Sequence, residues 1–245
     1  MSARVRVTGR RFPRGAAGFS LIELMVVILI IGIVAALAIP AMSVMGFDRE
    51  AYNDAGSIMM LFRSARTRAV ARGGAVLVSM SANGASDRGT FMMYEAISSN
   101  VGGGAAETPL STCKSPTSWL PLPTTANLNA HPAPTSAGGN GVNLIDGVNL
   151  NVTGTEVQAN IQTTLNQYPS PTASTAVPFT SGYICYTPLG HTYVVIGNAP
   201  NAGNMFDGVL PTVSPLEAAV TRTNGGMTRS VLLPPNGMAR LFSHT

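Results

Sequence analysis

Residues 19–39 form a run of 21 residues in which every residue but Ser20 and Glu23 is apolar or glycine. As an α-helix this run would be about 32 Å long, which matches a hydrocarbon core of about 30 Å. A serine hydroxyl can bond to a carbonyl of its own helix, but an intramembrane carboxylate is costly and by default marks function. The run therefore predicts a membrane-spanning helix, with Glu23 as its main candidate functional residue.

The positive charge of the chain is concentrated before this run. Five of the 15 Lys and Arg residues precede Gly18, which leaves 10 basic residues against 11 acidic ones in the rest of the chain. The net charge of +4 therefore does not indicate a basic domain. Arginines beside an apolar run keep that end of the chain cytoplasmic, and the bulk of the chain is expected on the other side of the membrane.

A secretory signal peptide is the first alternative interpretation of the N-terminus. Ala36-Leu37-Ala38 resembles a small-x-small cleavage site, but the apolar run is longer than the 7 to 15 residues typical of a signal peptide. A plain signal anchor has the right length but leaves Glu23 unexplained. Neither alternative accounts for the whole pattern.

The segment Gly18-Phe-Ser-Leu-Ile-Glu23-Leu-Met, after an arginine-rich leader, resembles the class III leader of type IV pilins and type II secretion pseudopilins. Pro40, at the twenty-second position after Gly18, also matches this family. The resemblance implies that a prepilin peptidase cleaves after Gly18 and N-methylates Phe19. It also implies partners: other pilins or pseudopilins in a filament, and an inner-membrane assembly platform.

The role expected for Glu23 follows from charge. Cleavage would leave the amine of Phe19 as a cation, about 6 Å from Glu23 along the helix axis. In a filament, Glu23 of one subunit can pair with the terminal amine of a neighbour and set the axial register, because an unpaired buried charge is penalised. The alternative is a glutamate that merely reaches the membrane interface.

The helix is expected to continue beyond the membrane. Pro40 should kink or locally open it. Apolar residues then recur at steps of three and four from Ile58 to Ala69, and Gly73-Gly74 provides a C-cap. The charged residues of this half are expected on a solvated face, with a phosphate-binding patch as the alternative: Asp48, Arg49, Glu50, Asp54, Arg63, Arg66, Arg68 and Arg72.

Strand patterns follow the helix at 75–80, 90–94, 182–196 and 228–242. Between them, residues 100–180 contain only four charged side chains, and we expect a long irregular insertion there, with Asp146-Gly147 as a hairpin turn. The predicted fold is α+β: a long helix packed on an antiparallel β-sheet domain, as in type IV pilins. The predicted domains are 1–18 leader, 19–39 transmembrane and polymerisation helix, 40–72 amphipathic helix, and 73–245 periplasmic β-rich domain.

The soluble region is similar to the GspH/FimT-type minor pilins and pseudopilins. The similarity rests on three segments: residues 65–78, 184–190, and 229–233 with Asn236-Gly237. It implies a minor pilin that primes or caps a type IV pilus, in the bacterial inner membrane and then near the filament tip. A type II secretion pseudopilin is the close alternative.

Cys113 and Cys185 lack the spacing of a metal site, so no metal or other cofactor is expected. A disulfide between them and a pair of buried thiols remain as alternatives. No catalytic motif surrounds His131, His191 or His244, and we do not expect an enzyme.

DNA binding is a further alternative function, because some minor pilins of this branch bind DNA through a C-terminal glycine followed by arginines. Here Gly237-Met-Ala-Arg240 keeps one arginine, which Arg222 and Arg229 would have to join. Phosphate binding needs several cations, so this function is expected to be the weaker alternative.

Overall fold

The computed structural model describes residues 19–82, 87–98, 108–109, 113, 140–151, 161–170, 172, 174–197, 214–223, 226–234 and 238–244. Side chains are not described for residues 37–47, 96–98, 108–109 and 140–143. The chain divides into two units, Met1–Val44 and Met45–Thr245, which are described separately below.

Helix α1 spans Leu21–Arg72 and has the extent that the sequence predicts. Gly73 follows the last residue of the helix, and its φ of 65° is the left-handed conformation of a C-cap, which glycine adopts without steric cost. Pro40 lies within α1, and the helix continues through it. The kink expected at Pro40 stays a prediction.

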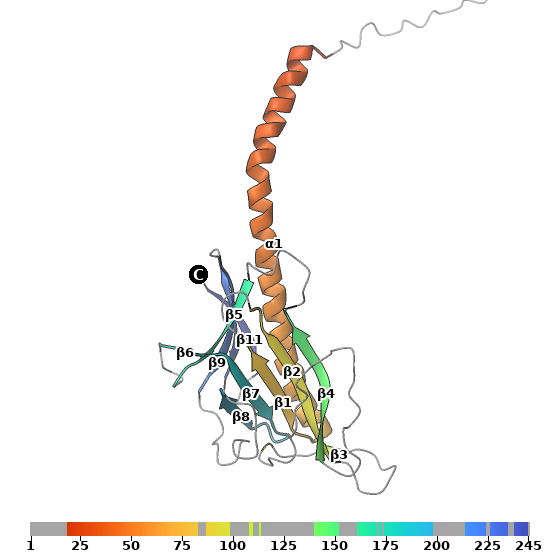
Figure 1. The fold of residues 1–245 in the computed structure, drawn as a ribbon, viewed down its shortest axis with the longest axis vertical. Coiled ribbons are helices and arrows are strands. Elements are labelled where there is room, and N and C mark those ends of the chain that lie inside the picture. The colour runs from red at the N-terminus through yellow and green to blue at the C-terminus, as the bar shows by residue number, and fades with distance from the viewer. Residues whose placement is uncertain are drawn as a thin grey trace, which may run out of the picture. The chain divides into compact units, whose positions relative to one another are not determined.

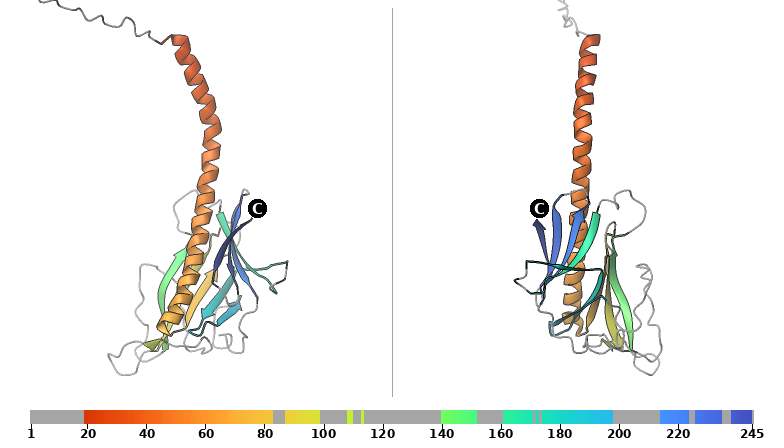
Figure 2. Two further views of the ribbon diagram at one scale, coloured as in Figure 1. Left: turned by 180° about the vertical axis from the view of Figure 1, so that it is seen from behind. Right: turned by 60° about the vertical axis from the view of Figure 1, so that its left-hand side comes forward.

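In the second unit, two antiparallel sheets pack on α1 (Figures 1 and 2). The first sheet has the order β3-β2-β1-β7-β8, and β4 also pairs with β2. Its strands are β1 Val76–Ser81, β2 Thr90–Ser98, β3 Thr108–Pro109, β4 Asn140–Asn149, β7 Ser181–Tyr186 and β8 Thr192–Ile196. The second sheet has the order β11-β10-β9-β5-β6. Its strands are β5 Ile161–Gln167, β6 Val177–Phe179, β9 Leu216–Arg222, β10 Thr228–Leu233 and β11 Arg240–His244.

The α+β class is confirmed, and strands β1, β2, β7, β8, β10 and β11 lie where the sequence patterns predict strands. They pair as β1 with β2, β7 with β8, and β10 with β11. The strands divide between two antiparallel sheets. The second half of α1 packs against both sheets, and residues of all three form one apolar core. In this core Phe62 of α1 meets Phe91 of β2 edge to face, with ring centroids 6.2 Å apart.

The expected irregular insertion at 100–180 is wrong for β3, β4, β5 and β6, which lie inside that range. Strand β5 alternates buried and half-buried residues, and its Ile161 and Leu165 belong to the core. Its intervening residues are Thr, Asn and Gln, so low charge there reflects a neutral sheet face and not a lack of structure.

The expected hairpin turn at Asp146-Gly147 is also wrong. Both residues lie inside β4, where Asp146 pairs with Met93 and Gly147 with Met92 of β2. The register then shifts, so that Tyr94 pairs with Leu144 and Ile145 is the additional residue of a β-bulge. The bulge lets Ile145 and Val148 both pack against the main core although they are three positions apart.

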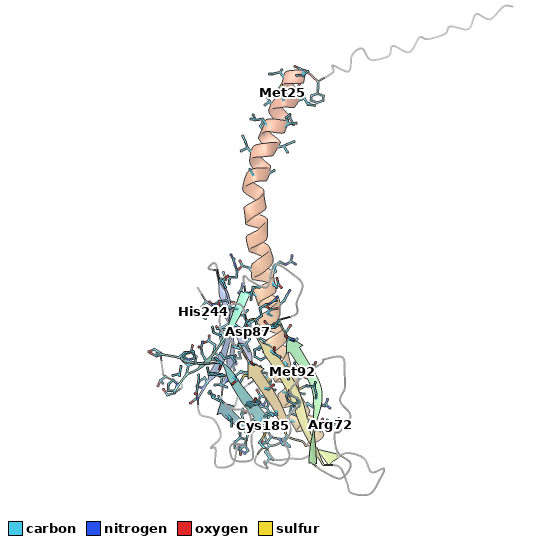
Figure 3. All side chains as sticks on the ribbon, viewed as in Figure 1. Met25, Arg72, Asp87, Met92, Cys185 and His244 are labelled. Carbon is cyan, nitrogen blue, oxygen red and sulfur yellow. A yellow bond between two sulfur atoms is a disulfide. The ribbon has the colours of Figure 1, made fainter. Side chains whose placement is uncertain are left out.

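The outer face of the first sheet carries a second apolar cluster, which includes Leu77, Tyr94, Leu144 and Cys185. Cys113 is buried against this cluster and is joined to Cys185 of β7 by a disulfide with a Cα–Cα distance of 6.0 Å (Figure 3). Of the two alternatives for the cysteines, the structure contains the bonded one. The disulfide ties a residue 72 positions away in sequence to the middle of the sheet.

Candidate functional site: an exposed apolar segment with one carboxylate

The described side chains from Phe19 to Ala36 are all exposed, and we call these residues the apolar segment. Phe19 is 81% exposed, and the bulky aliphatic side chains that follow it are exposed on every side of the helix. A helix that is apolar all round is stable only where lipid or other protein covers it. The apolar segment is therefore the part of the molecule that most needs a partner.

Glu23 lies in the first turn of α1 and is the only charged residue of the apolar segment. The helix begins with a hydrogen bond from the Leu24 amide to the Ser20 carbonyl. A carboxylate in a first turn is stabilised by the unpaired amides and the helix dipole, so Glu23 is compatible with the helix. Its side chain is exposed, as pairing with a second molecule would require.

Three other expectations concern the same region. Gly18, the expected cleavage residue, lies outside the described residues, and the structure does not test the role of Phe19 in methylation. The third expectation is the membrane-spanning helix of residues 19–39. Over the described part of the chain, no helix has the combination of length and apolarity needed to cross a membrane.

The three arginines considered for DNA binding do not form one patch. Arg222 is 9% exposed at its side chain and pairs with Asp48 of α1 at 3.0 Å. The guanidinium of Arg229 lies over the ring of Tyr52, 5.7 Å from its centroid, and donates a hydrogen bond to Ser243. Both arginines are therefore engaged at the junction between α1 and the second sheet.

Arg240 lies on the opposite face of that sheet. Arg240 pairs with Leu232 and therefore lies on the same face as Leu232. Arg229 shares the other face with Val231 and Leu233, which point into the core. The side chains of Arg229 and Arg240 must therefore point to opposite faces, and the second sheet offers no surface on which all three cations converge.

The histidines show no catalytic arrangement among the described residues. His191 is exposed in the turn between β7 and β8, where its backbone groups bond to Thr187. His244 lies on edge strand β11, with Nδ1 3.5 Å from the Ser230 hydroxyl, and His131 is outside the described residues. Within the described ranges, no group of His, Cys, Asp and Glu could hold a metal ion. The expectation that the chain is not an enzyme stays a prediction.

The charged residues of α1 have a role that the sequence analysis missed. The expected solvated face is wrong for several of them, because they form ion pairs with residues of the strands and of the β1–β2 connection. The side chain of Arg88, which is 8% exposed, donates to Asp54 at 2.6 Å and 3.0 Å and also pairs with Glu50 at 2.9 Å. Burial raises the pKa of the Asp54 carboxyl, while the hydrogen bond and charge of Arg88 lower it less strongly.

A second ion cluster joins the last turns of α1 to β2. The side chain of Glu95 is 2% exposed, and it pairs with Arg68 and Arg72, each at 2.9 Å. Arg68 donates hydrogen bonds to Oε2, whereas the Arg72 contact to Oε1 is an ion pair without hydrogen-bond geometry. No sequence signal would have identified these pairs, because the partners are 27 and 23 residues apart on different elements.

Comparison with known proteins supports the N-terminal resemblance. Residues 13–39 match the family model of the prokaryotic N-terminal methylation motif, a range that includes Gly18, Phe19 and Glu23. The match is to a type IV pilin-like leader and covers this short range alone. No curated protein and no solved structure matches the chain.

Proposed function

We propose that this chain is a structural minor pilin that primes or caps a type IV pilus. A prepilin peptidase cleaves after Gly18 and methylates the amine of Phe19. The apolar segment then anchors the chain in the inner membrane in a single pass, before assembly with other pilins moves it into the filament. The observation that carries this proposal is Glu23, the one carboxylate of the exposed apolar segment, which lies within the matched methylation motif.

The physical role of Glu23 is to select the axial position of neighbouring subunits. Two opposite charges at about 4 Å attract by roughly 4 kcal/mol at an effective dielectric of 20, and by much less in water. A position that brings the amine of one subunit to Glu23 of the next is favoured over positions that leave both groups unpaired in an apolar bundle.

The disulfide supports the expected location of the β-rich unit. Disulfides persist in oxidising compartments such as the bacterial periplasm. The pair Cys113–Cys185 is therefore consistent with a domain on the periplasmic side, opposite the five arginines of the leader.

A Glu23→Ala substitution tests the proposed role. The variant should still be cleaved and methylated, because the cut lies outside the pairing, but it should enter filaments poorly. Leu24→Ala, the adjacent exposed position, is the matched control and should assemble like the parent chain. Quantitative immunoblots of sheared filaments and of membranes measure both steps, and normal incorporation of the Glu23→Ala chain would refute the pairing role.

A type II secretion pseudopilin would share the leader, the anchor and the helix, so the host phenotype separates the two functions. If the chain is a minor pilin, its deletion should reduce surface pili and leave protein secretion intact. Lost secretion with normal piliation would assign the chain to the secretion system instead.

A further inference from the structure

The second half of α1 carries a shallow groove of about 510 Å³ on the face turned away from the core. Its floor is a stripe of exposed residues at steps of four, three and four: Met60, Ser64, Thr67 and Ala71. Three of these four side chains are small. A rod-shaped partner can therefore approach the backbone of α1 closely along this stripe.

Arginines border the groove on both sides. At 100° per residue, Arg63 falls on one side of the stripe, and Arg68 and Arg72 fall on the other. Arg63 is positioned by a hydrogen bond from its Nε to the Ala239 carbonyl at 3.0 Å. Arg68 and Arg72 are positioned by Glu95, and Figure 3 labels Arg72 near the end of α1.

These arginines keep donors for a further partner. Glu95 offsets one of the three positive charges, so the borders of the groove retain two. Among the described residues, the Nη groups of Arg63 and of Arg72 have no hydrogen-bond acceptor. The groove thus presents cationic donors on both sides of a small-residue stripe, which suits anionic groups arranged in the same way.

We propose that this α1 groove binds an amphipathic helix of a different subunit, one with small residues along its contact stripe and carboxylates on both sides of it. The groove runs along the axis of α1, and its arginines, from Arg63 to Arg72, span ten residues, or about 14 Å of axis. A second copy of this chain is a poor occupant, because its own groove face would add arginines. Its carboxylates at Asp48, Glu50 and Asp54 already pair with Arg222 and Arg88.

The inference rests on the proposed function, since assembly supplies neighbouring helices, and it specifies what kind of neighbour fits. Nucleic acid is the less suited polyanion, because two net charges neutralise too few phosphates for useful affinity at physiological salt.

Binding of designed peptides to the full chain in detergent micelles tests the proposal. One peptide is helical, with Ala and Ser along one stripe and Glu on both sides of it; a control peptide has the same composition with Glu distributed around the helix. Fluorescence anisotropy should show binding of the first peptide that is stronger than that of the control and that weakens with salt.

Variants of the chain assign the binding to the groove. Arg63→Gln and Arg72→Gln should each weaken binding by roughly two- to fivefold, and together by roughly tenfold, since the positions are far enough apart for near-additive effects. Arg49→Gln, an exposed arginine of α1 outside the groove, is the matched control and should change nothing. Ser64→Trp should prevent binding of the helical peptide, because the indole would occupy the floor of the groove. Circular dichroism verifies that each variant is folded.

Three results would overturn the proposal: equal binding of the two peptides, loss of binding with Arg49→Gln alone, or self-association of the chain that depends on Arg63 and Arg72. Tighter binding of a DNA oligonucleotide that tolerates Ser64→Trp would replace it with a polyanion site. Leader processing does not enter this assay, so its failure and the failure of the proposed function are distinguishable.

Discussion

Asp54 is a carboxylate that the fold buries at the contact between α1 and the β1–β2 connection, where it accepts two hydrogen bonds from Arg88. Its burial is the larger influence and raises its pKa above the ordinary value of 3.8. The charged form of Asp54 is thus less favourable in the folded chain than in the unfolded chain, even with Arg88 beside it.

Asp54 should contribute to the pH dependence of the free energy of unfolding. From pH 3.8 up to the raised pKa, the folded chain binds more protons at Asp54 than the unfolded chain does, so this group lowers the free energy of unfolding as the pH rises. Asp54→Asn keeps an acceptor oxygen for Arg88 but cannot titrate. The free energy of unfolding of the parent chain, minus that of the Asp54→Asn variant, should therefore decrease as the pH rises from about 4 to 7.

Urea unfolding of the detergent-solubilised chain, followed by circular dichroism at several pH values, measures this difference. A difference that stays constant, or that grows as the pH rises, would show that Asp54 does not carry the effect.

Among the elements, those with local signals were predictable from sequence and those without them were not. Helix α1 has an apolar period and a glycine C-cap, and the hairpins β7–β8 and β10–β11 have turn residues between β-rich runs. Strand β9 was missed because its sequence, LEAAVTR, contains good helix formers and lacks a turn signal. It is a strand because β5 and β10 pair with it on both sides, which is a tertiary effect.

The residues of the candidate site also divide into those that could be predicted from local sequence and those that could not. Glu23 stands out within one short motif and could be identified from sequence. The ion pairs of Arg88 and Glu95, and the groove bordered by Arg63 and Arg72, depend on which strand lies beside which turn of α1. Sequence spacing contains no such information.

At the end of α1, Gly73 should be sensitive to a side chain. Its φ of 65° disfavours residues with a Cβ, so Gly73→Ala should lower the free energy of unfolding by about 1 kcal/mol. Gly56→Ala is the matched control inside the helix, where an added Cβ meets nothing within 4 Å, and it should raise stability by about 1 kcal/mol. Equal effects of the two substitutions in urea unfolding would contradict the C-cap assignment.

The disulfide should stabilise the attachment of Cys113 to the first sheet. In the chain-entropy model, closing a loop of 72 residues contributes about 4 kcal/mol. Reductant should therefore lower the melting temperature of the parent chain and leave a Cys113→Ser/Cys185→Ser double variant unchanged. If the melting temperature of the parent chain is unchanged after verified reduction, the disulfide does not stabilise the fold.

For the whole molecule, the two units have opposite relations to their surroundings. The β-rich unit buries apolar residues in two clusters of its own, whereas the apolar segment of the first unit exposes all of its side chains. A chain built in this way depends on lipid or on other subunits for the stability of its N-terminal part. The proposed sequence of cleavage, anchoring and assembly supplies each of these environments in turn.

The proposed function requires a mature chain that begins at Phe19 with a methylated amine close to Glu23. Intact-mass and N-terminal peptide mass spectrometry of the chain purified from its host membranes tests it directly. The expected mature polypeptide starts at Phe19 and carries one additional methyl group on its terminal nitrogen. An intact leader, or a start at any other residue such as one following Ala38, would contradict it.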